Sequence, residues 1–245
     1  MQKDSFEKIG NFLFKYRGQL PLVLIVFSIP FIIIDTSIRT TEPFIENIFY
    51  ILSFLFILSG HFIRFIAIGY KSLHSSGKNR DQQVADKLNT KGIYSIVRHP
   101  LYLANLFIWL GLSLILKNLL FFSLTCVFFS LIYWFIIYAE ESFLKEKFQL
   151  EHQQWAKKTP AFFPNGFSYE KVNTFFNWKM VWKNEYPGIC ATFSCIWFIE
   201  VIKYYWISKS LFLPLPLILF ALFILIFGIG SKWLKHKTCF FPKVG

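Results

Sequence analysis

The stretch GIYSIVRHPLYLANLFIWLG, residues 92–111, places an arginine, a histidine and a proline directly before a long apolar run. Proline is favoured in the first turn of a helix, because its missing N–H would have no partner there. The run that follows Pro100 therefore predicts a helix that begins at the membrane surface and continues into the lipid. This places Arg98 and His99 at the mouth of a predicted membrane helix.

The composition indicates an integral membrane protein. Of the 245 residues, 55% are hydrophobic and only 16% are charged, whereas soluble domains carry about 25% charged residues. The formal net charge is +12. Because the basic residues lie between apolar runs, they indicate the loop bias of membrane proteins and contact with anionic lipid headgroups, with no nucleic acid as a partner.

Six apolar segments predict an all-α, multi-pass transmembrane helical bundle. The expected spans are 20–34, 47–70, 101–116, 118–139, 188–207 and 211–230. Only Lys117 and Asn118 separate the third span from the fourth, which predicts a tight helical hairpin. No glycine or proline occurs from Leu112 to Thr159, so the fourth helix is expected to project beyond the lipid unless it bends.

The distribution of basic residues predicts that both termini face the cytosol, and we expect the membrane to be a bacterial inner membrane. With this orientation, nearly every lysine and arginine outside the spans lies on the cytosolic side. The outer loops then hold only Arg39, Lys117 and Lys209.

The polar segments divide the chain into three regions. An N-terminal helix and the first two spans make up residues 1–70, and an amphipathic linker with the last two spans makes up 170–245. Between them lies a core, 71–169, which contains the hairpin and the two long polar segments attached to it. Both polar segments meet the hairpin on the cytosolic side, so we expect a functional site there.

Glu140 and Glu141 stand where the fourth span leaves the lipid. Because the start of one helix and the end of the other are neighbours in a hairpin, we expect these glutamates to lie beside Arg98 and His99. An acidic residue at a helix C-terminus opposes the helix dipole, and such an unfavourable choice often marks a functional site. In the alternative interpretation, Arg98 reaches lipid phosphates and Glu141 pairs with Lys145 on an ordinary helix end.

Groups of both charges at one helix mouth suit a zwitterionic ligand, and S-adenosylmethionine is such a ligand. The helix N-terminus beside Arg98 favours an anion. Tyr94 and Tyr102 supply rings that can stack on an adenine or face a sulfonium. The pattern permits this cofactor without selecting it.

The segment GIYSIVRHPLY, followed by EESFLKEKFQLEHQQWAKKTPAFFP, resembles the isoprenylcysteine carboxyl methyltransferase family, which also includes phospholipid N-methyltransferases. The resemblance covers about residues 79–164. The matching positions are Gly92, Tyr94, Arg98, His99, Pro100, Tyr102, Glu140, Glu141, Phe148, Trp155 and Pro164. In two departures, Gln149 stands where the family has glycine, and Ile136 stands where prenylcysteine enzymes have an arginine for the substrate carboxylate. The second departure disfavours a prenylcysteine substrate.

The resemblance implies an enzyme, a methyltransferase that binds S-adenosyl-L-methionine at the cytosolic mouth of the hairpin. The family's cofactor-contacting positions correspond to Asn79, Asp86, Leu88, Asn89, Tyr94, His99, Pro100, Leu101, Tyr102, Glu140 and Glu141. Arg98 corresponds to an arginine of the family pattern. We take Arg98 as the catalytic residue, which anchors the cofactor carboxylate or the acceptor anion.

The acceptor is expected to be a membrane lipid or a lipidated substrate, with Arg64 and Asn105 as substrate-binding residues. Arg98 and the general positive charge favour an anionic oxygen, for example a lipid A phosphate or a carboxylate. A phospholipid amine is the alternative. No metal is expected, because the cysteines form no CxxC pair and no cysteine–histidine spacing suits zinc.

Two other functions fit parts of the pattern. NADPH-dependent sterol-type reductases share a related hairpin, but they typically carry G-W-W-G-x-x-R-H where this chain has GIYSIVRH. Membrane transporters usually show helix breaks and charges at mid-membrane, whereas the polar cluster here lies at one surface. The charged residues inside the spans, among them Glu200 and Lys203, are expected to face the bundle interior, with these two as a pair.

Overall fold

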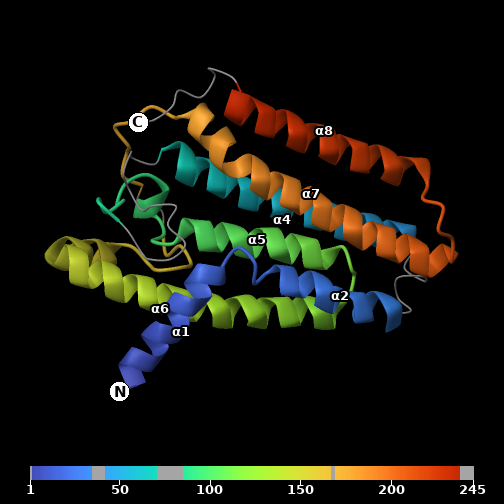
Figure 1. The fold of residues 1–245 in the computed structure, drawn as a ribbon. Coiled ribbons are helices and arrows are strands. Elements are labelled where there is room, and N and C mark those ends of the chain that lie inside the picture. Colours follow the sequence, from blue (N-terminus) through green and yellow to red (C-terminus); the bar gives the residue numbers. More distant parts are fainter. Residues whose placement is uncertain (1, 35–41, 71–84, 167–168, 238–245) are drawn as a thin grey trace.

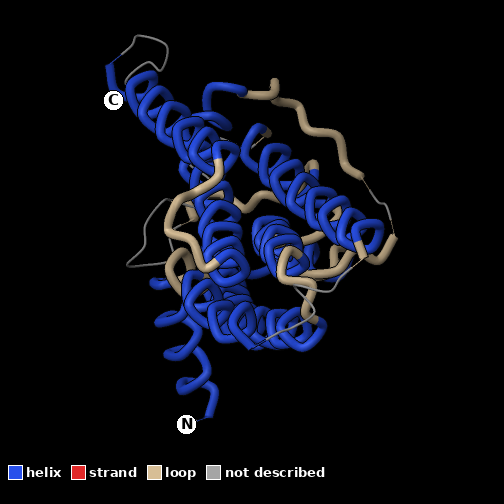
Figure 2. The backbone as a smooth tube through the Cα atoms, turned by 90° about the vertical axis from the view of Figure 1, so that its right-hand side faces the viewer, coloured by secondary structure: helices blue, strands red, loops and turns tan. Residues whose placement is uncertain are grey.

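The computed structural model describes residues 2–34, 42–70, 85–166 and 169–237. Within these ranges the chain forms seven α-helices and one 3-10 turn, without a β-strand. They are α1 (Gln2–Tyr16), α2 (Leu22–Ile34), α4 (Pro43–Gly69), η1 (Ile93–Ser95), α5 (Pro100–Leu114), α6 (Leu119–Lys158), α7 (Trp178–Ser208) and α8 (Leu215–Lys237). The predicted all-α bundle is therefore confirmed (Figures 1 and 2).

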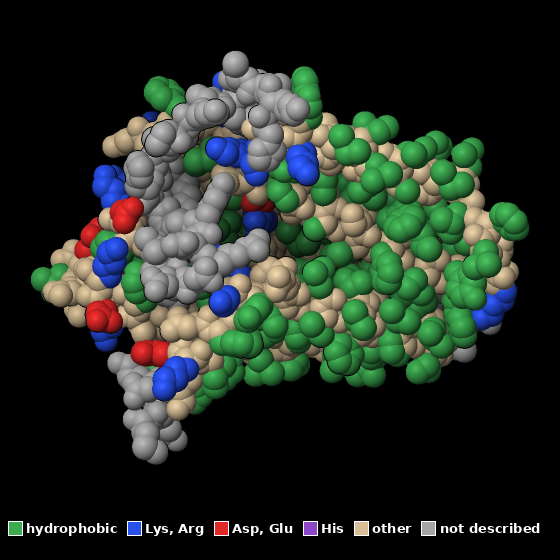
Figure 3. Space-filling model, in the orientation of Figure 1, with side chains coloured by type: hydrophobic (Ala, Val, Ile, Leu, Met, Phe, Trp, Pro, Cys, Tyr) green, Lys and Arg blue, Asp and Glu red, His purple; other side chains and the backbone are tan. Residues whose placement is uncertain are grey.

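Four helices, α4, α6, α7 and α8, are long and apolar enough to cross a membrane, and α2 and α5 are shorter apolar helices. Each of the six corresponds to a predicted span. Figure 1 shows their long axes running in nearly one direction. In Figure 3, hydrophobic side chains cover most of the visible face, and charged side chains gather mainly at one end. The chain is a membrane protein; its orientation and its membrane stay predictions.

Two glycines allow α4 and α5 to pack closely in antiparallel directions. A Cβ at Gly60 would lie 2.7 Å from the carbonyl oxygen of Ala104, and a Cβ at Gly111 would lie 2.7 Å from that of Ser53. No side chain fits at either position, and such small residues are typical of close helix pairs in membranes. This packing sets the C-terminal end of α4 beside the start of α5, where the candidate site lies.

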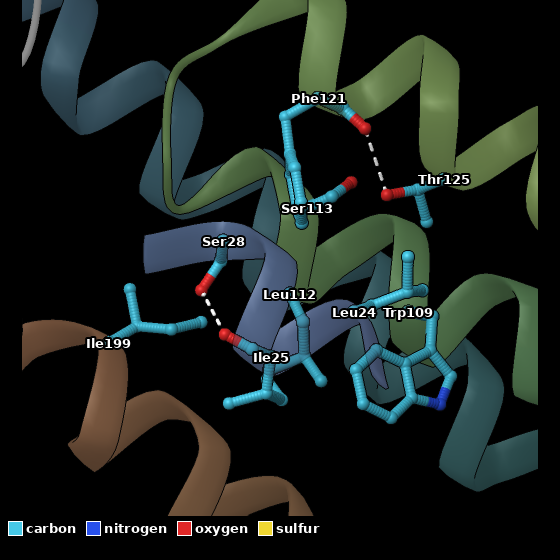
Figure 4. A pocket seen from close by; sticks show the side chains of 9 residues that line it. All are labelled: Leu24, Ile25, Ser28, Trp109, Leu112, Ser113, Phe121, Thr125 and Ile199. Carbon is cyan, nitrogen blue, oxygen red and sulfur yellow. Dashed lines mark hydrogen bonds between the residues drawn. The ribbon is translucent and has the colours of Figure 1, made fainter. Parts of the chain in front are cut away.

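The interior at the other half of the bundle is closed. Figure 4 shows a pocket of only about 10 Å³ between α2, α5, α6 and α7. Its hydroxyl groups are satisfied within their own helices: Ser28 donates to the carbonyl of Ile25 at 2.7 Å, and Thr125 donates to that of Phe121 at 2.9 Å. A space of this size holds one water molecule at most, so this region is packed core.

The predicted hairpin forms between α5 and α6. Lys117 adopts a positive φ of 57°, and the side chain of Asn118 accepts a hydrogen bond from the Phe121 N–H at 2.8 Å, which caps α6. The connection covers residues 115–118 and is two residues longer than predicted, because α5 already ends at Leu114, but it still joins the two helices as a hairpin.

α6 bends sharply at Gln149, where φ is 38° and ψ is −107°. The segment beyond the bend, residues 150–161, turns back over the mouth of the hairpin; we call it the fold-back segment. His152 thereby reaches within 3.1 Å of Glu141, although the same separation along a straight helix would span roughly 16 Å. The fourth helix therefore does not simply project away from the bundle.

α7 begins at Trp178, well before the predicted start at residue 188. The prediction was wrong here because Pro187 looks like a helix boundary, whereas it lies inside α7. The helix is capped by Asn177, whose side chain accepts from the Met180 N–H at 2.9 Å. As a result, Glu185 lies inside the helix and not in a polar linker.

Candidate functional site

Glu141 is the centre of the site cluster, which we define as Arg98, His99, Glu140, Glu141 and His152. Arg98 donates to its two carboxylate oxygens from Nε and Nη2, at 2.9 Å each. Nε2 of His99 lies 2.7 Å from one oxygen, and Nε2 of His152 lies 3.1 Å from the other. The hairpin therefore joins the Arg-His pair to the Glu pair as the sequence predicts. The alternative partner of Glu141, Lys145, is exposed.

Arg98 also fastens the fold-back segment. Its Nη1 donates to the carbonyl oxygens of Ala156, at 3.2 Å, and of Thr159, at 2.5 Å. Its backbone N–H donates to the carbonyl of Pro160 at 2.9 Å. Arg98 therefore has only one guanidinium N–H group left for a ligand, because four of the five already have protein partners. Its role as the catalytic residue stays a prediction.

Glu140 is held differently from Glu141. Its Oε2 accepts from the hydroxyl of Tyr102 at 2.7 Å and lies 3.5 Å from Nδ1 of His99. Its Oε1 makes no hydrogen bond to the described part of the chain, and 22% of its side chain is exposed. The Tyr102 ring stacks on His99, with centroids 5.6 Å apart, and on Tyr133, with centroids 5.0 Å apart. Within the described residues, one oxygen of Glu140 is therefore held and the other is not.

The two glutamates keep His99 charged. Burial alone lowers the pKa of a histidine, but the hydrogen bonds and charges of Glu140 and Glu141 outweigh it and raise the pKa of His99 from 6.5 to about 9. Burial, together with the charge of Glu140, raises the pKa of Tyr94 above its ordinary value. His99 is thus an imidazolium at neutral pH, and Tyr94 is a neutral phenol.

A pocket of about 240 Å³ lies next to the site cluster. It is lined by the end of α4, by residues 88–94 and by residues 172–174. Leu88, Asn89 and Tyr94, three of the predicted cofactor-contacting residues, line it. The indole N–H of Trp155 donates to the carbonyl of Tyr94 at 2.8 Å and ties this wall to the fold-back segment.

The other predicted cofactor residues are placed less favourably. Pro100 is buried in the first turn of α5, and Leu101 beside it is partly buried. Asp86 is exposed and does not line the pocket. Asn79 lies outside the described residues. The structure therefore groups most of the predicted contacts around one mouth and leaves their roles as predictions.

Arg64 and Asn105, the predicted substrate-binding residues, contact each other. Nη1 of Arg64 donates to Oδ1 of Asn105 at 2.6 Å. Arg64 also makes a bidentate ion pair with Glu185 of α7, at 2.5 Å from Nε and 2.8 Å from Nη2. Glu185 is only 1% exposed. A buried carboxylate near a membrane span usually has a functional or structural partner. Glu185 was not predicted as a site residue, because the fifth span was expected to begin only after Pro187.

His152 is the second residue that sequence reasoning missed. Its distance along the chain from Glu141 predicts no contact on a straight helix, and only the bend at Gln149 brings the two together. The one signal was the departure at Gln149 from the glycine of the family pattern. Within the described ranges, no group of three or more His, Cys, Asp or Glu side chains is suited to hold a metal ion.

Comparisons with known proteins match the same part of the chain. Residues 48–151 match the family model described as phospholipid methyltransferase. The cobalt-zinc-cadmium resistance protein CzcN of Cupriavidus metallidurans is 36% identical over 103 residues, which are 42% of this chain and 45% of that protein. The nickel-cobalt-cadmium resistance protein NccN of Alcaligenes xylosoxydans xylosoxydans is 31% identical over 104 residues, or 42% and 46% of the two chains.

A third relative is a named methyltransferase. The protein-S-isoprenylcysteine O-methyltransferase of Schizosaccharomyces pombe is 30% identical over 131 residues, which are 49% of this chain and 52% of that protein. The chain thus matches about half the length of these curated relatives. No solved structure matches it.

The matched segment contains Arg64, Arg98, His99, Asn105, Glu140 and Glu141, and it ends just before His152. The resemblance drawn from the sequence motifs is thereby confirmed as a similarity. Residues 48–151, which we call the matched segment, match the phospholipid methyltransferase family model, and part of the chain is similar to an isoprenylcysteine O-methyltransferase.

Proposed function

We propose that this chain is a membrane-embedded methyltransferase that uses S-adenosylmethionine to methylate a lipid-borne acceptor. The observation that carries the proposal is the site cluster, four of whose five residues lie in the segment that matches the family model. There Glu140 is oriented by Tyr102 and His99, while its Oε1 makes no hydrogen bond to the described residues. The site lies at the end of the bundle where most lysines and arginines fall. We take that end as cytosolic, in a bacterial inner membrane, where the soluble cofactor is available.

The residues at the mouth fit S-adenosylmethionine. The Oε1 atom of Glu140 can accept hydrogen bonds from an ammonium or a ribose hydroxyl. Tyr94 and Tyr102 offer rings to an adenine or a sulfonium. Leu88 and Asn89 line the pocket beside them. When bound, the cofactor supplies a methyl group on a positively charged sulfur.

The chain's own task is to orient the acceptor and exclude water. Arg98 holds the fold-back segment over the mouth through Ala156 and Thr159. His99 and Tyr102 fix the Glu140 side chain from two directions. Orientation of this kind contributes roughly 7–11 kcal/mol in favourable cases. An acceptor amine must first release its ammonium proton, for example to water at the membrane surface; once neutral, it needs no further catalytic group for the attack itself.

The paired charges favour a zwitterionic phospholipid over an anionic acceptor. The sequence favoured an anionic oxygen because of Arg98 and the general positive charge. In the structure, two of the arginines at this end are paired with carboxylates, Arg98 with Glu141 and Arg64 with Glu185. We therefore place a phospholipid amine first and a lipid phosphate such as that of lipid A second. Ile136 is fully buried where prenylcysteine enzymes have an arginine, so a prenylcysteine acceptor is not favoured.

Calorimetric titration of the purified protein in detergent with S-adenosylmethionine and, separately, with NADPH tests the proposal. We expect S-adenosylmethionine alone to bind, and binding to weaken strongly in His99→Ala and Glu140→Gln. Methyl-labelled cofactor should then transfer label into phosphatidylethanolamine vesicles in preference to vesicles of an anionic lipid. Binding of NADPH instead would support a reductase. If neither cofactor binds, the proposal fails.

A further inference from the structure

α7 lies outside the matched segment, yet it reaches the residues predicted to bind the acceptor. Glu185 is buried and uses both carboxylate oxygens on Arg64 of α4. Arg64 in turn contacts Asn105 of α5. One turn before Arg64 on α4, His61 lies 3.1 Å from the hydroxyl of Thr192, again on α7. α7 is thus fastened to the matched segment at the level of the acceptor residues.

Arg64 keeps donors to spare in this arrangement. Its three hydrogen bonds to the described residues use Nε and one N–H on each terminal nitrogen. Two N–H groups therefore make no hydrogen bond within the described ranges, and 21% of the side chain is exposed. A guanidinium held in one orientation by a bidentate carboxylate presents its remaining donors in a fixed direction.

The hydroxyl of Tyr133 is the second unused group at this place. Tyr133 is only 3% exposed, and its hydroxyl makes no hydrogen bond of normal length and angle in the described part of the chain. The Asn105 side chain lies close enough to interact with the hydroxyl oxygen, so it is the hydroxyl proton that lacks an acceptor there. A buried donor without an acceptor costs about 1–3 kcal/mol. Such a cost is typical of a group that a ligand completes.

We propose that α7 completes the acceptor site: Glu185 positions Arg64 so that Arg64 and the Tyr133 hydroxyl together bind the headgroup phosphate of the acceptor lipid. This inference rests on the proposed function and deepens it. The Arg64 guanidinium and the Tyr133 hydroxyl can both donate hydrogen bonds, and phosphate oxygens accept them, so a phosphate is a suitable ligand for this pair. Tyr133 lies on the same face of α6 as Glu140, two turns away.

Tyr133→Phe tests the binding group with the smallest change to the fold. Removal of a hydroxyl whose proton lacks an acceptor among the described residues should leave the melting temperature equal or higher. We expect S-adenosylmethionine to bind within twofold of the parent, and methyl transfer at limiting phosphatidylethanolamine to fall about tenfold, which corresponds to one lost hydrogen bond. Transfer equal to that of the parent would overturn the role of Tyr133.

The arginine reagent phenylglyoxal, with peptide mass spectrometry, tests Glu185 without any need for activity. In the parent, Arg64 should react slowly, and phosphatidylethanolamine vesicles should slow it further, whereas inorganic phosphate should not. In Glu185→Gln, Arg64 should react several times faster and lose the lipid protection, while Arg98 reacts as before. Glu185→Asp should restore part of both effects. Glu200→Gln is the matched control on the same helix and should change neither.

The outcomes separate the two proposals. If Arg64 reacts and is protected equally in Glu185→Gln and in the parent, Glu185 does not position it and the inference is wrong. Protection by inorganic phosphate as strong as that by vesicles would assign the site to a free anion and overturn the lipid headgroup. If the parent transfers no methyl group while the lipid protects Arg64 in the expected way, the proposed function fails and the binding site stands.

Discussion

Two buried ionic clusters lie at opposite ends of the bundle, and they differ in how completely their polar groups are satisfied. The distal cluster consists of Glu46, Tyr50, Lys117, Glu200 and Lys203. Lys203 donates to Glu200 at 3.0 Å and to the Tyr50 hydroxyl at 2.8 Å, with the Ile115 carbonyl at 3.4 Å. Lys117 pairs with Glu46 at 2.9 Å. The predicted pair of Glu200 and Lys203 is therefore present.

At the site end, the end of the bundle that holds the site cluster, the polar groups have only part of the hydrogen bonds that they could make. Glu141 has three side-chain donors, but the neighbouring Glu140 Oε1 has none that the described residues supply. The hydroxyl of Tyr133 and Nδ1 of both His61 and His152 are buried there without a partner in those same ranges. A closed network fastens helices to one another, whereas an open one leaves donors and acceptors for a ligand. Residues of the same types thus form a closed network at one end and leave buried polar atoms without a described partner at the other.

The largest effect is expected from Glu141→Ala. It leaves Arg98 and His99 buried without their carboxylate, and removal of one partner of a buried ion pair costs about 3–5 kcal/mol. We expect a clear fall of the melting temperature in detergent. Glu200→Ala in the distal cluster should cost less, because the Glu200 side chain is 26% exposed. An equal or larger loss for Glu200→Ala would contradict the central place of Glu141.

Glu140→Gln should separate binding from stability. The amide still accepts from Tyr102, so the fold should persist, but a charge-assisted contact to the cofactor is lost. Such a contact is worth about 1.5–3 kcal/mol, which predicts a loss of roughly 10–100-fold in methyl transfer. Transfer of labelled methyl groups into vesicles measures it. Glu200→Gln should retain the activity of the parent, and a comparable loss there would show that the site end is not special.

Alkaline pH should lower the stability of the protein, because His99 in the site cluster then loses its charge. Its pKa in the fold is about 9, above the ordinary value of 6.5. The charged imidazole therefore contributes stability that is fully present below pH 6.5 and is lost as the pH rises through about 9. The melting temperature of the parent should fall between pH 8 and pH 10 by more than that of His99→Gln. Parallel curves for the two proteins would contradict this assignment.

The smallest effect is expected at the bend. Gln149 has a φ of 38° and a ψ of −107°, a conformation that glycine adopts without strain. Gln149→Gly should raise the free energy of unfolding by about 1 kcal/mol, because strain of this kind costs roughly 1–3 kcal/mol. Gln153→Gly, in the regular helix a turn later, should lower it by about 0.5–1 kcal/mol. Thermal unfolding of both variants tests the opposite signs.

The sequence predicts the elements whose causes are local. The apolar segments predict the helices, and the turn at Lys117 and Asn118 predicts the hairpin, because so short a connection leaves no other arrangement. The hairpin then brings Arg98 and His99 to Glu140 and Glu141. Each of these steps depends on neighbours along the chain or on a single turn.

The contacts that could not be predicted from the sequence join segments that lie apart along the chain. His152 reaches Glu141 only because Gln149 adopts a backbone conformation that its own side chain disfavours, and no local pattern predicts that choice. Glu185 contacts Arg64 across the bundle. It lies on α7, whose start was predicted too late in the chain because Pro187 looks like a helix boundary. Arg98 is held by its tertiary partners, so its side chain could not be placed from the helix mouth alone.

The ion pair between Arg64 and Glu185 has a consequence for how this protein can be divided. A fragment that ends with the matched segment at residue 151 would keep Arg64 but lose the carboxylate of Glu185, with which Arg64 is paired. It would also lose His152 and the fold-back segment. The recognisable segment is thus not an autonomous module, and exchange of such segments between relatives should succeed only when the matching stretch of α7 is exchanged with it.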